Sequence, residues 1–269
     1  MKAKNLLILS FAIVLFWAIP LSQQSSAIQP DSPENSSRHL KLGKPQAVYE
    51  RFREGYALAE DARLKIPVWV QYELRLEDLK DGVKRNTKFV ADPSIPAGSR
   101  AEVSDYKGSG FDQGHMAPAA DMTRSQNIMD DCFLLSNIAP QVGVGFNRQI
   151  WKSLEDDVRG WVKERGPLTI IIGPVFEANE NTVSYQVIGK DLVAIPTHFF
   201  KIIVDANNKD NITALAFLMP NKDLRGHDLS EFLISIDNIQ KLTGLDFLSA
   251  LPADQQEKIE SAKATRIWQ

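Results

Sequence analysis

The segment Leu168-Thr-Ile-Ile-Ile-Gly173, with four consecutive β-branched residues, constrains the fold more than any other segment of the chain. The run is stopped by a Gly-Pro pair, and it therefore predicts a buried strand. Residues 67–74 instead alternate, with Val68, Val70 and Tyr72 on one face and Trp69 and Gln71 on the other. This second pattern predicts a half-buried strand, so the chain is expected to build a sheet.

Further strands are expected at residues 192–195, 199–204 and 212–219, with Asn207-Asn208 marking a turn. Helices are predicted at residues 146–164, 229–242 and 253–264. In the first, Trp151, Leu154, Val158 and Trp161 form one apolar stripe. Strands and helices do not alternate strictly, so the pattern favours an α+β fold with a largely antiparallel central sheet flanked by helices.

The N-terminus has the layout of a secretory signal peptide over residues 1–27. Lys2 and Lys4 precede an apolar run at residues 6–21, and Ser25 and Ala27 stand at the positions of a signal cleavage site. An uncleaved membrane anchor is the alternative, but the run is shorter than the roughly 20 residues that span a bilayer. We expect a periplasmic or secreted protein with no stable membrane association after cleavage.

The mature chain is expected to contain a flexible lead-in at residues 28–41 and one single domain at residues 42–269. The full chain has 31 basic and 34 acidic residues, so loss of the two leader lysines gives a charge of about -5. This balance excludes a basic protein that coats nucleic acid. The single cysteine, Cys132, excludes an intramolecular disulfide framework and is expected to be buried and inert.

The segment from Tyr106 to Glu155 contains the residues that are candidates for a catalytic or metal-binding role. It contains a lone histidine, His115, among turn-forming residues, and a predicted helix with Asn147 at its start and Glu155 two turns later. Asn147 and Glu155 can therefore face one cleft, with His115 arriving from another segment.

These three residue types suit metal-assisted phosphodiester hydrolysis. A neutral imidazole is a competent general base, and amide and carboxylate oxygens are ligands that Mg²⁺ accepts. The spacing alone leaves ordinary alternatives open, because a histidine beside glycine is often structural and an asparagine at a helix start is often a cap.

The segment Gly110-Phe-Asp-Gln-Gly-His-Met-Ala-Pro-Ala-Ala-Asp121 resembles the active-site signature of the DNA/RNA non-specific endonucleases, the ββα-metal nucleases. Further blocks in the order of that family cover most of residues 45–252, including residues 84–96, 133–141, 147–155, 195–201 and 243–247. The resemblance implies a ββα-metal nuclease fold and hydrolysis of DNA and RNA without sequence specificity, leaving 5′-phosphates.

By this resemblance, His115 is the general base and Asn147 is the direct protein ligand of Mg²⁺, with Mn²⁺ as the alternative ion. Glu155 would hold the waters of the metal, and Asn137 would orient the histidine or the phosphate. Arg85 matches the arginine that stabilises the transition state, although Lys88 is a nearby alternative. Asp112 would brace the catalytic loop, with a simple turn-forming role as its alternative, and Arg148 is expected to contact substrate.

Gln113 is the one departure from the family signature, which usually has arginine there. Glutamine offers a neutral amide in place of a charged, forked donor, so we expect Gln113 to bind phosphate less strongly. Two alternatives therefore stay open. One is a secreted nucleic-acid-binding protein of the same fold with weak or no turnover, and the other is a phosphodiesterase for small diesters.

The other histidines are expected to have ordinary roles. His198 is predicted to lie in or near the core, and His39 and His227 are predicted to be solvated.

Overall fold

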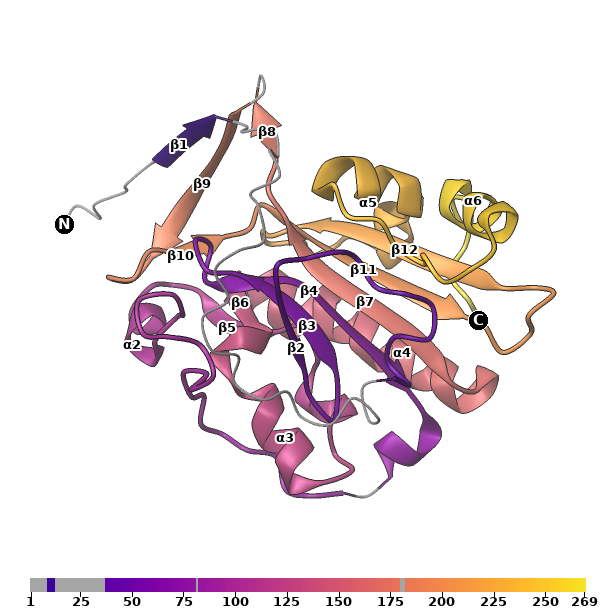
Figure 1. Ribbon diagram of the computed structural model, residues 1–269, viewed down its shortest axis with the longest axis horizontal. Coiled ribbons are helices and arrows are strands. Elements are labelled where there is room, and N and C mark those ends of the chain that lie inside the picture. Colours follow the sequence, from indigo (N-terminus) through magenta and orange to yellow (C-terminus); the bar gives the residue numbers. More distant parts are fainter. Residues whose placement is uncertain (1–8, 13–36, 81, 180–181) are drawn as a thin grey trace, which may run out of the picture.

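The computed structural model describes residues 9–12, 37–80, 82–179 and 182–269, and its centre is a six-stranded antiparallel sheet (Figure 1). The strand order is β12-β11-β7-β4-β3-β2. The strands are β2 (Tyr49–Phe52), β3 (Ala57–Asp61), β4 (Ile66–Leu74), β7 (Leu168–Val175), β11 (His198–Asp205) and β12 (Thr213–Pro220). The expected α+β class with an antiparallel sheet is confirmed.

Strand β7 lies in the middle of this sheet, between β4 and β11, and all of its residues are buried. The prediction from the β-branched run is therefore confirmed, and the strand continues through Pro174 to Val175. Gly173 is required where it stands, because a Cβ there would lie 2.5 Å from the Val68 carbonyl oxygen and 2.6 Å from the Phe200 ring. The expected strands at residues 192–195, 199–204 and 212–219 are present as β10 (Val193–Ile195), β11 and β12.

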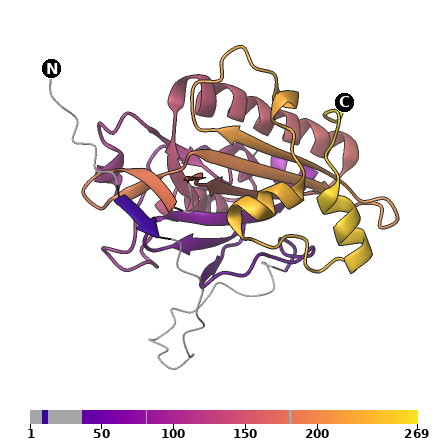
Figure 2. The ribbon, with the colours of Figure 1, turned by 90° about the horizontal axis from the view of Figure 1, so that it is seen from above.

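Helices cover both faces of the sheet. On one face, α4 (Trp151–Arg165) buries the predicted stripe of Trp151, Leu154, Val158 and Trp161. On the other, α5 (Ile236–Thr243) and α6 (Ala253–Ser261) pack on side chains of β11 such as Phe200 and Ile202. Figure 2 shows α4 on one side of the strands and the two C-terminal helices on the other.

The helix expected at residues 229–242 is broken, so that prediction is wrong in its middle. A short 3₁₀ turn, η5 (Leu229–Phe232), ends where Leu233 forms a β-bridge with Phe217 of β12. The chain then restarts as α5, with the Ser235 side chain accepting a hydrogen bond from the Asn238 backbone. The helix therefore begins after a serine N-cap. The spacing of apolar residues does not reveal such a cap.

The predictions of a half-buried β4 and a solvated His39 are both wrong, for one reason. Gln71 and Glu73, on the polar face of β4, are buried because residues 38–43 lie over them. Gln71 donates hydrogen bonds to the backbone oxygens of His39 and Gly43, at 2.8 and 2.9 Å. His39 itself is fully buried and its Nδ1 accepts from the Glu73 backbone at 3.0 Å.

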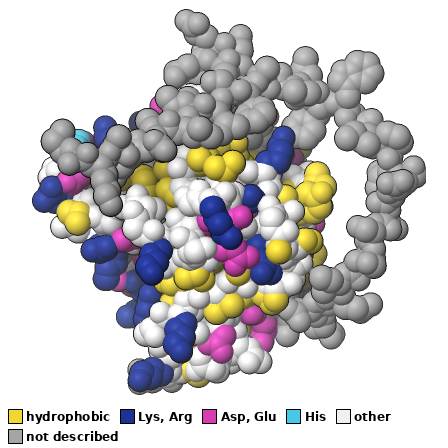
Figure 3. Space-filling view, turned by 90° about the vertical axis from the view of Figure 1, so that its left-hand side faces the viewer, with side chains coloured by type: hydrophobic (Ala, Val, Ile, Leu, Met, Phe, Trp, Pro, Cys, Tyr) yellow, Lys and Arg dark blue, Asp and Glu magenta, His cyan; other side chains and the backbone are white. Residues whose placement is uncertain are grey.

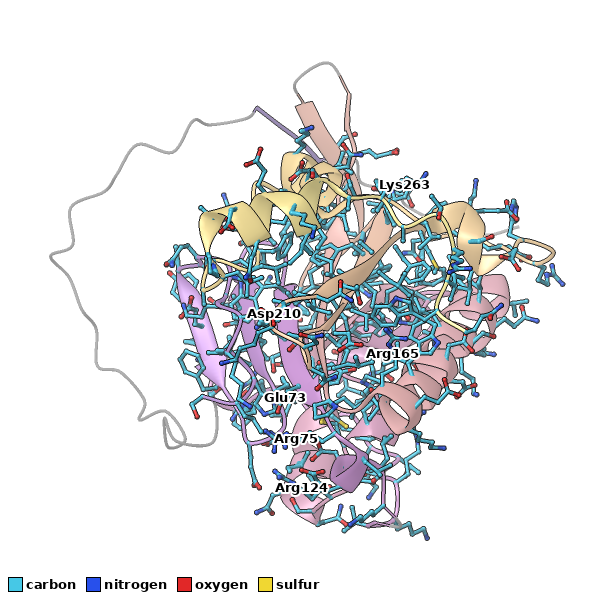
Figure 4. The ribbon with its side chains drawn as sticks, turned by 90° about the vertical axis from the view of Figure 1, so that its right-hand side faces the viewer. Glu73, Arg75, Arg124, Arg165, Asp210 and Lys263 are labelled. Carbon is cyan, nitrogen blue, oxygen red and sulfur yellow. The ribbon has the colours of Figure 1, made fainter. Side chains whose placement is uncertain are left out.

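Charged side chains form ion pairs around Glu73, beside the segment 38–43. Lys41 pairs with Glu73 at 3.1 Å, and Arg75 also donates to Glu73. Figure 4 shows Glu73 and Arg75 at neighbouring positions, with Arg124 beyond them. The described part of the predicted lead-in, from Ser37 onward, is therefore packed against the sheet by hydrogen bonds and ion pairs.

Smaller elements complete the molecule. They are β1 (Leu9–Ala12), η1 (Leu76–Leu79), α2 (Val103–Tyr106), β5 (Asp112–His115), η2 (Ala119–Asp121), α3 (Gln126–Cys132), η3 (Leu135–Asn137), β6 (Ile138–Gln141), η4 (Gly143–Ile150), β8 (Ala178–Asn179) and β9 (Thr182–Ile188). Strand β9 pairs with β1, β8 and β10. Apart from β1, the predicted signal peptide lies outside the described residues. None of the described helices is long and apolar enough to cross a bilayer.

Candidate active site

A two-stranded antiparallel ribbon made of β5 and β6 carries His115 at the end of β5. Asp112 is paired with Gln141 and His115 with Ile138. Since side chains alternate along a strand, Gln113 and His115 face one side and Asp112 and Gly114 face the other. Gly114 has no room for a side chain, because a Cβ there would lie 2.2 Å from the Gln141 amide.

His115 lies in an aromatic setting. Its ring centroid is 5.2 Å from that of Phe89 and 4.8 Å from that of Phe133. Its Nε2 is covered and has no hydrogen-bond partner among the described residues. Burial, with a smaller effect of the Arg85 charge, lowers the pKa of His115 to about 3. The imidazole is therefore neutral near neutral pH.

Arg85 approaches the same aromatic group from an exposed loop. Its guanidinium carbon lies 5.2 Å from the Phe133 ring centroid. The loop is fixed to residues 133–135 by hydrogen bonds from Val90 to Phe133 and from Leu135 to Val90, at 3.1 and 2.9 Å. These contacts favour Arg85 over Lys88 as the cation nearest His115.

Asn137 is fully buried beneath the segment that follows His115. Its Oδ1 accepts from the Ala117 backbone at 3.0 Å, and its Nδ2 donates to the backbone oxygens of Ala117 and Cys132, both at 2.9 Å. Of the two expected roles, these contacts favour orienting His115, because the amide is already occupied by backbone groups and covered. Cys132 is buried as expected, and burial raises the pKa of its thiol to about 12.

Asn147 lies in η4, a wide helical turn that runs directly into α4. The expected helix at residues 146–164 is therefore present as η4 and α4 together. Asn147 Nδ2 donates to Asp112 Oδ2 at 2.9 Å. Since a carboxylate only accepts hydrogen bonds, the amide nitrogen faces Asp112, and Oδ1 is left without a donor among the described residues.

Arg148 also binds Asp112, through Nε at 2.7 Å and through a second guanidinium nitrogen. Burial opposes ionisation of Asp112, but the hydrogen bonds from Arg148 and Asn147 outweigh it and hold its pKa below the usual value. Asp112 is thus more than a turn-forming residue, because it joins β5 to the helix that carries Asn147. Arg148 remains 64% exposed while it makes this contact.

Glu155 lies two turns further along, on α4, with 14% of its side chain exposed. Burial raises its pKa to about 7, and the opposing effect of Lys201 is the next largest. Lys201 Nζ lies 3.9 Å from Glu155 Oε1 and is itself buried. Sequence reasoning missed Lys201. Its signal is a lysine at a position of β11 that faces inward, between the buried apolar residues Phe199 and Ile203.

The described residues include no group of three His, Cys, Asp or Glu side chains that would hold a metal. No hydrogen bond or ion pair in this part of the chain joins His115 to Asn147 or Glu155. The donors that are present, one amide oxygen and one carboxylate, are hard oxygen ligands and fit a hydrated Mg²⁺ ion better than zinc.

The segment that carries the site is balanced in formal charge, since residues 80–165 contain 12 basic and 12 acidic residues, of which Asp92, Asp105 and Asp121 are buried. On the face that carries α2, Lys and Arg side chains stand in separate groups with acidic side chains among them (Figure 3). Lys80, Lys84, Arg85 and Lys88 are exposed in the loop beside the site. A nucleic acid would therefore meet local phosphate contacts instead of one continuous basic surface.

Comparisons with known proteins agree with this architecture. Residues 35–254 match a family model described as DNA/RNA non-specific endonuclease. The chain is 40% identical over 215 residues to mitochondrial endonuclease G of Homo sapiens, covering 77% of this chain and 72% of that protein. It is 37% identical over 227 residues to nuclease C1 of Cunninghamella echinulata var. echinulata, covering 81% and 90%.

A solved structure has the same fold. It is the crystal structure of an EndoG/EndoGI complex, with a TM-score of 0.77, 34% sequence identity, and coverage of 81% of this chain and 93% of that chain. The expected ββα-metal nuclease fold is thereby confirmed. The chain belongs to the DNA/RNA non-specific endonuclease family, a family of metal-dependent nucleases, and it is an enzyme that hydrolyses nucleic acids.

Proposed function

We propose that this protein is an exported, Mg²⁺-dependent endonuclease that hydrolyses phosphodiester bonds of both DNA and RNA, with His115 as the general base. The observation that carries the proposal is the hydrogen bond from Asn147 Nδ2 to Asp112. This bond directs Nδ2 toward Asp112 and leaves Asn147 Oδ1 free to bind a metal. The same strand, β5, carries His115 three residues later.

His115 accepts a proton from the attacking water at Nδ1, because its Nε2 is covered. The imidazole is neutral above pH about 3 in the free enzyme. A phosphodiester beside it adds negative charge, which raises the pKa of the imidazole and strengthens it as a base. Arg85, whose guanidinium carbon lies 5.2 Å from the Phe133 ring centroid, supplies a cation for the charge that develops on phosphate.

Asn147 Oδ1 and, through water, Glu155 would hold the Mg²⁺ ion. When bound, the metal supplies positive charge that stabilises the departing oxygen. Gln113 shares the face of His115, and its Nε2 has no partner among the described residues. Because this atom is buried, its neutral amide would bind phosphate only after the side chain turns outward.

Export is proposed from Lys2, Lys4, the apolar run at residues 6–21 and the cleavage pattern at Ser25 and Ala27. N-terminal sequencing of protein from the culture medium or periplasm tests it, and a mature chain beginning at Ile28 is expected.

The enzymatic proposal is tested with supercoiled plasmid and single-stranded RNA, each with Mg²⁺ or with an excess of chelator. We expect both to be cut only with Mg²⁺, and the new ends to carry 5′-phosphates. Binding of both polymers without cleavage would favour the nucleic-acid-binding alternative. Hydrolysis of a small chromogenic diester alone would favour the phosphodiesterase alternative.

A further inference from the structure

Lys201 is a buried charge to which the proposed reaction gives no task. It lies in the middle of β11 with 1% of its surface exposed. Its register partners on the neighbouring strands are Ile172 and Phe217, both fully buried. A lysine in such surroundings is costly, because its ammonium loses its hydration. Burial also prevents it from reaching a nucleic acid directly.

Three groups act on the ammonium, namely the Trp151 ring, the Glu155 carboxylate and, with a smaller effect, the Asp121 carboxylate. The Trp151 ring centroid lies 4.3 Å from Nζ, and Glu155 Oε1 lies 3.9 Å away. Lys201 donates no hydrogen bond to any described residue. Its electrostatic partner across the gap between β11 and α4 is therefore the carboxylate of Glu155, over the face of Trp151.

The other nearby cation is already committed. Arg159 donates to Asp121 at 2.8 Å and also to Asp156. Asp121 in turn accepts a hydrogen bond from Tyr72 at 2.7 Å. Lys201 is thus the remaining positive charge beside Glu155 among the described residues.

Glu155 has unused acceptor capacity. No described residue donates a hydrogen bond to either of its oxygens, and its side chain keeps 14% exposure. A carboxylate without hydrogen-bond donors is free to rotate unless a fixed charge defines its position. Residues behind metal ligands commonly serve this purpose, and their loss typically costs 10- to 100-fold in metal affinity or activity.

We propose that Lys201 is a positioning residue, which from β11 holds Glu155 in the orientation that binds the waters of the metal. The inference rests on the proposed function of Glu155. Lys201 acts through Glu155 and touches neither substrate nor metal.

The test compares Lys201→Met, which keeps length and apolar contacts, with Lys201→Arg, which keeps the charge. Mg²⁺ affinity is measured by calorimetry on the protein without nucleic acid, and the Mg²⁺ requirement by plasmid cleavage. Ile203→Ala is the matched control, because Ile203 is the next residue on the same buried face but is uncharged. Circular dichroism checks that each variant is folded.

We expect Lys201→Met to weaken Mg²⁺ binding by about tenfold or more. Lys201→Arg should recover most of the loss, and Ile203→Ala should lower the melting temperature without changing Mg²⁺ affinity. In a Glu155→Gln background, Lys201→Met should change Mg²⁺ affinity by less than about twofold, because the two residues act as one unit.

A folded Lys201→Met variant with wild-type Mg²⁺ affinity would overturn the proposal, as would an equal loss in the Glu155→Gln background. If Lys201→Met does not fold, Lys201→Gln takes its place in the same comparison. A wild-type protein that neither binds Mg²⁺ nor cuts nucleic acid would overturn the proposed function together with this inference. Wild-type binding with unaffected variants would overturn the role of Lys201 alone.

Discussion

Asn147 donates its side-chain amide to the Asp112 carboxylate at 2.9 Å, and this bond joins the strand that ends in His115 to the helix that continues to Glu155. The two segments are also linked by the pairing of β5 with β6, which ends two residues before η4, and Asp112 adds a side-chain contact between them. Arg148 binds the same carboxylate from the surface. Asp112 therefore fixes the direction of the Asn147 oxygen.

Asp112→Asn is expected to lower the cleavage rate at a fixed Mg²⁺ concentration by about 10- to 100-fold, as is typical for groups that orient metal ligands. The neutral amide can present its own NH₂ group to Asn147, so the Asn147 amide loses its single defined orientation. Asp156→Asn is a suitable control, since Asp156 is an exposed carboxylate of α4 paired with Lys152. Equal rates for the two variants would contradict the role given to Asp112.

Gly145 controls how the chain enters the helix of Asn147. Its φ is +85°, and a Cβ there would lie 1.9 Å from Asp223 Oδ1. Gly145→Ala should therefore destabilise the protein by about 1–3 kcal/mol and reduce Mg²⁺ affinity. Gly160→Ala on α4 has no heavy atom within 4 Å of the added Cβ and should stabilise by up to about 1 kcal/mol. Urea denaturation of the two variants measures both free energies of unfolding. An unchanged stability of Gly145→Ala would show that the close approach of Gly145 to Asp223 is not needed.

The buried His39 predicts a pH-dependent stability. Burial lowers its folded pKa to about 4, whereas the unfolded value is near 6.5. Between these values only the unfolded chain binds the proton, so stability is lost as pH falls through that window. The full contribution above pH 6.5 is on the order of 3 kcal/mol.

The free energy of unfolding of wild type and His39→Gln, measured from pH 7 to pH 4, tests this expectation. Subtracting one curve from the other removes the contributions of His115 and of the carboxylates. The variant should be less stable at pH 7, and the difference should shrink as pH falls. A constant difference would show that His39 does not titrate as its burial requires.

The central elements of the fold follow from local sequence patterns. The β-branched run of β7 and the apolar stripe of α4 are local patterns that indicate burial without knowledge of the partner segment. Both elements were therefore predictable. The covering of β4 by residues 38–43 was not, because Gln71 and Glu73 look exposed until a distant segment supplies the hydrogen bonds that allow their burial. His39 and Lys201 were missed for the same reason, since each has its partners on other strands or helices.

The residue types of the site were predictable, and their contacts were not. Family resemblance identified Asp112, Asn147 and Arg148 separately, but only the three-dimensional structure shows that one carboxylate binds both neighbours. Asn137 was expected to orient His115 or the phosphate, and its three backbone hydrogen bonds favour the first role.

Gln113→Arg is expected to raise the cleavage rate, since a forked cation on the face of His115 adds a charged hydrogen bond to phosphate. A gain of about 1–3 kcal/mol in transition-state stabilisation corresponds to roughly 5- to 150-fold in kcat/KM. Gln113→Lys, which adds charge without the fork, should give a smaller gain. Unchanged kinetics in both variants would sink the proposed contact between position 113 and phosphate.

The most direct test of the whole account is plasmid and RNA cleavage by His115→Ala in saturating Mg²⁺, with calorimetry to confirm that the variant still binds the metal. We predict a folded protein with wild-type Mg²⁺ affinity and a cleavage rate lower by at least about 100-fold, the scale of general base catalysis. Cleavage at the wild-type rate by this variant would contradict the assignment of His115 as the base.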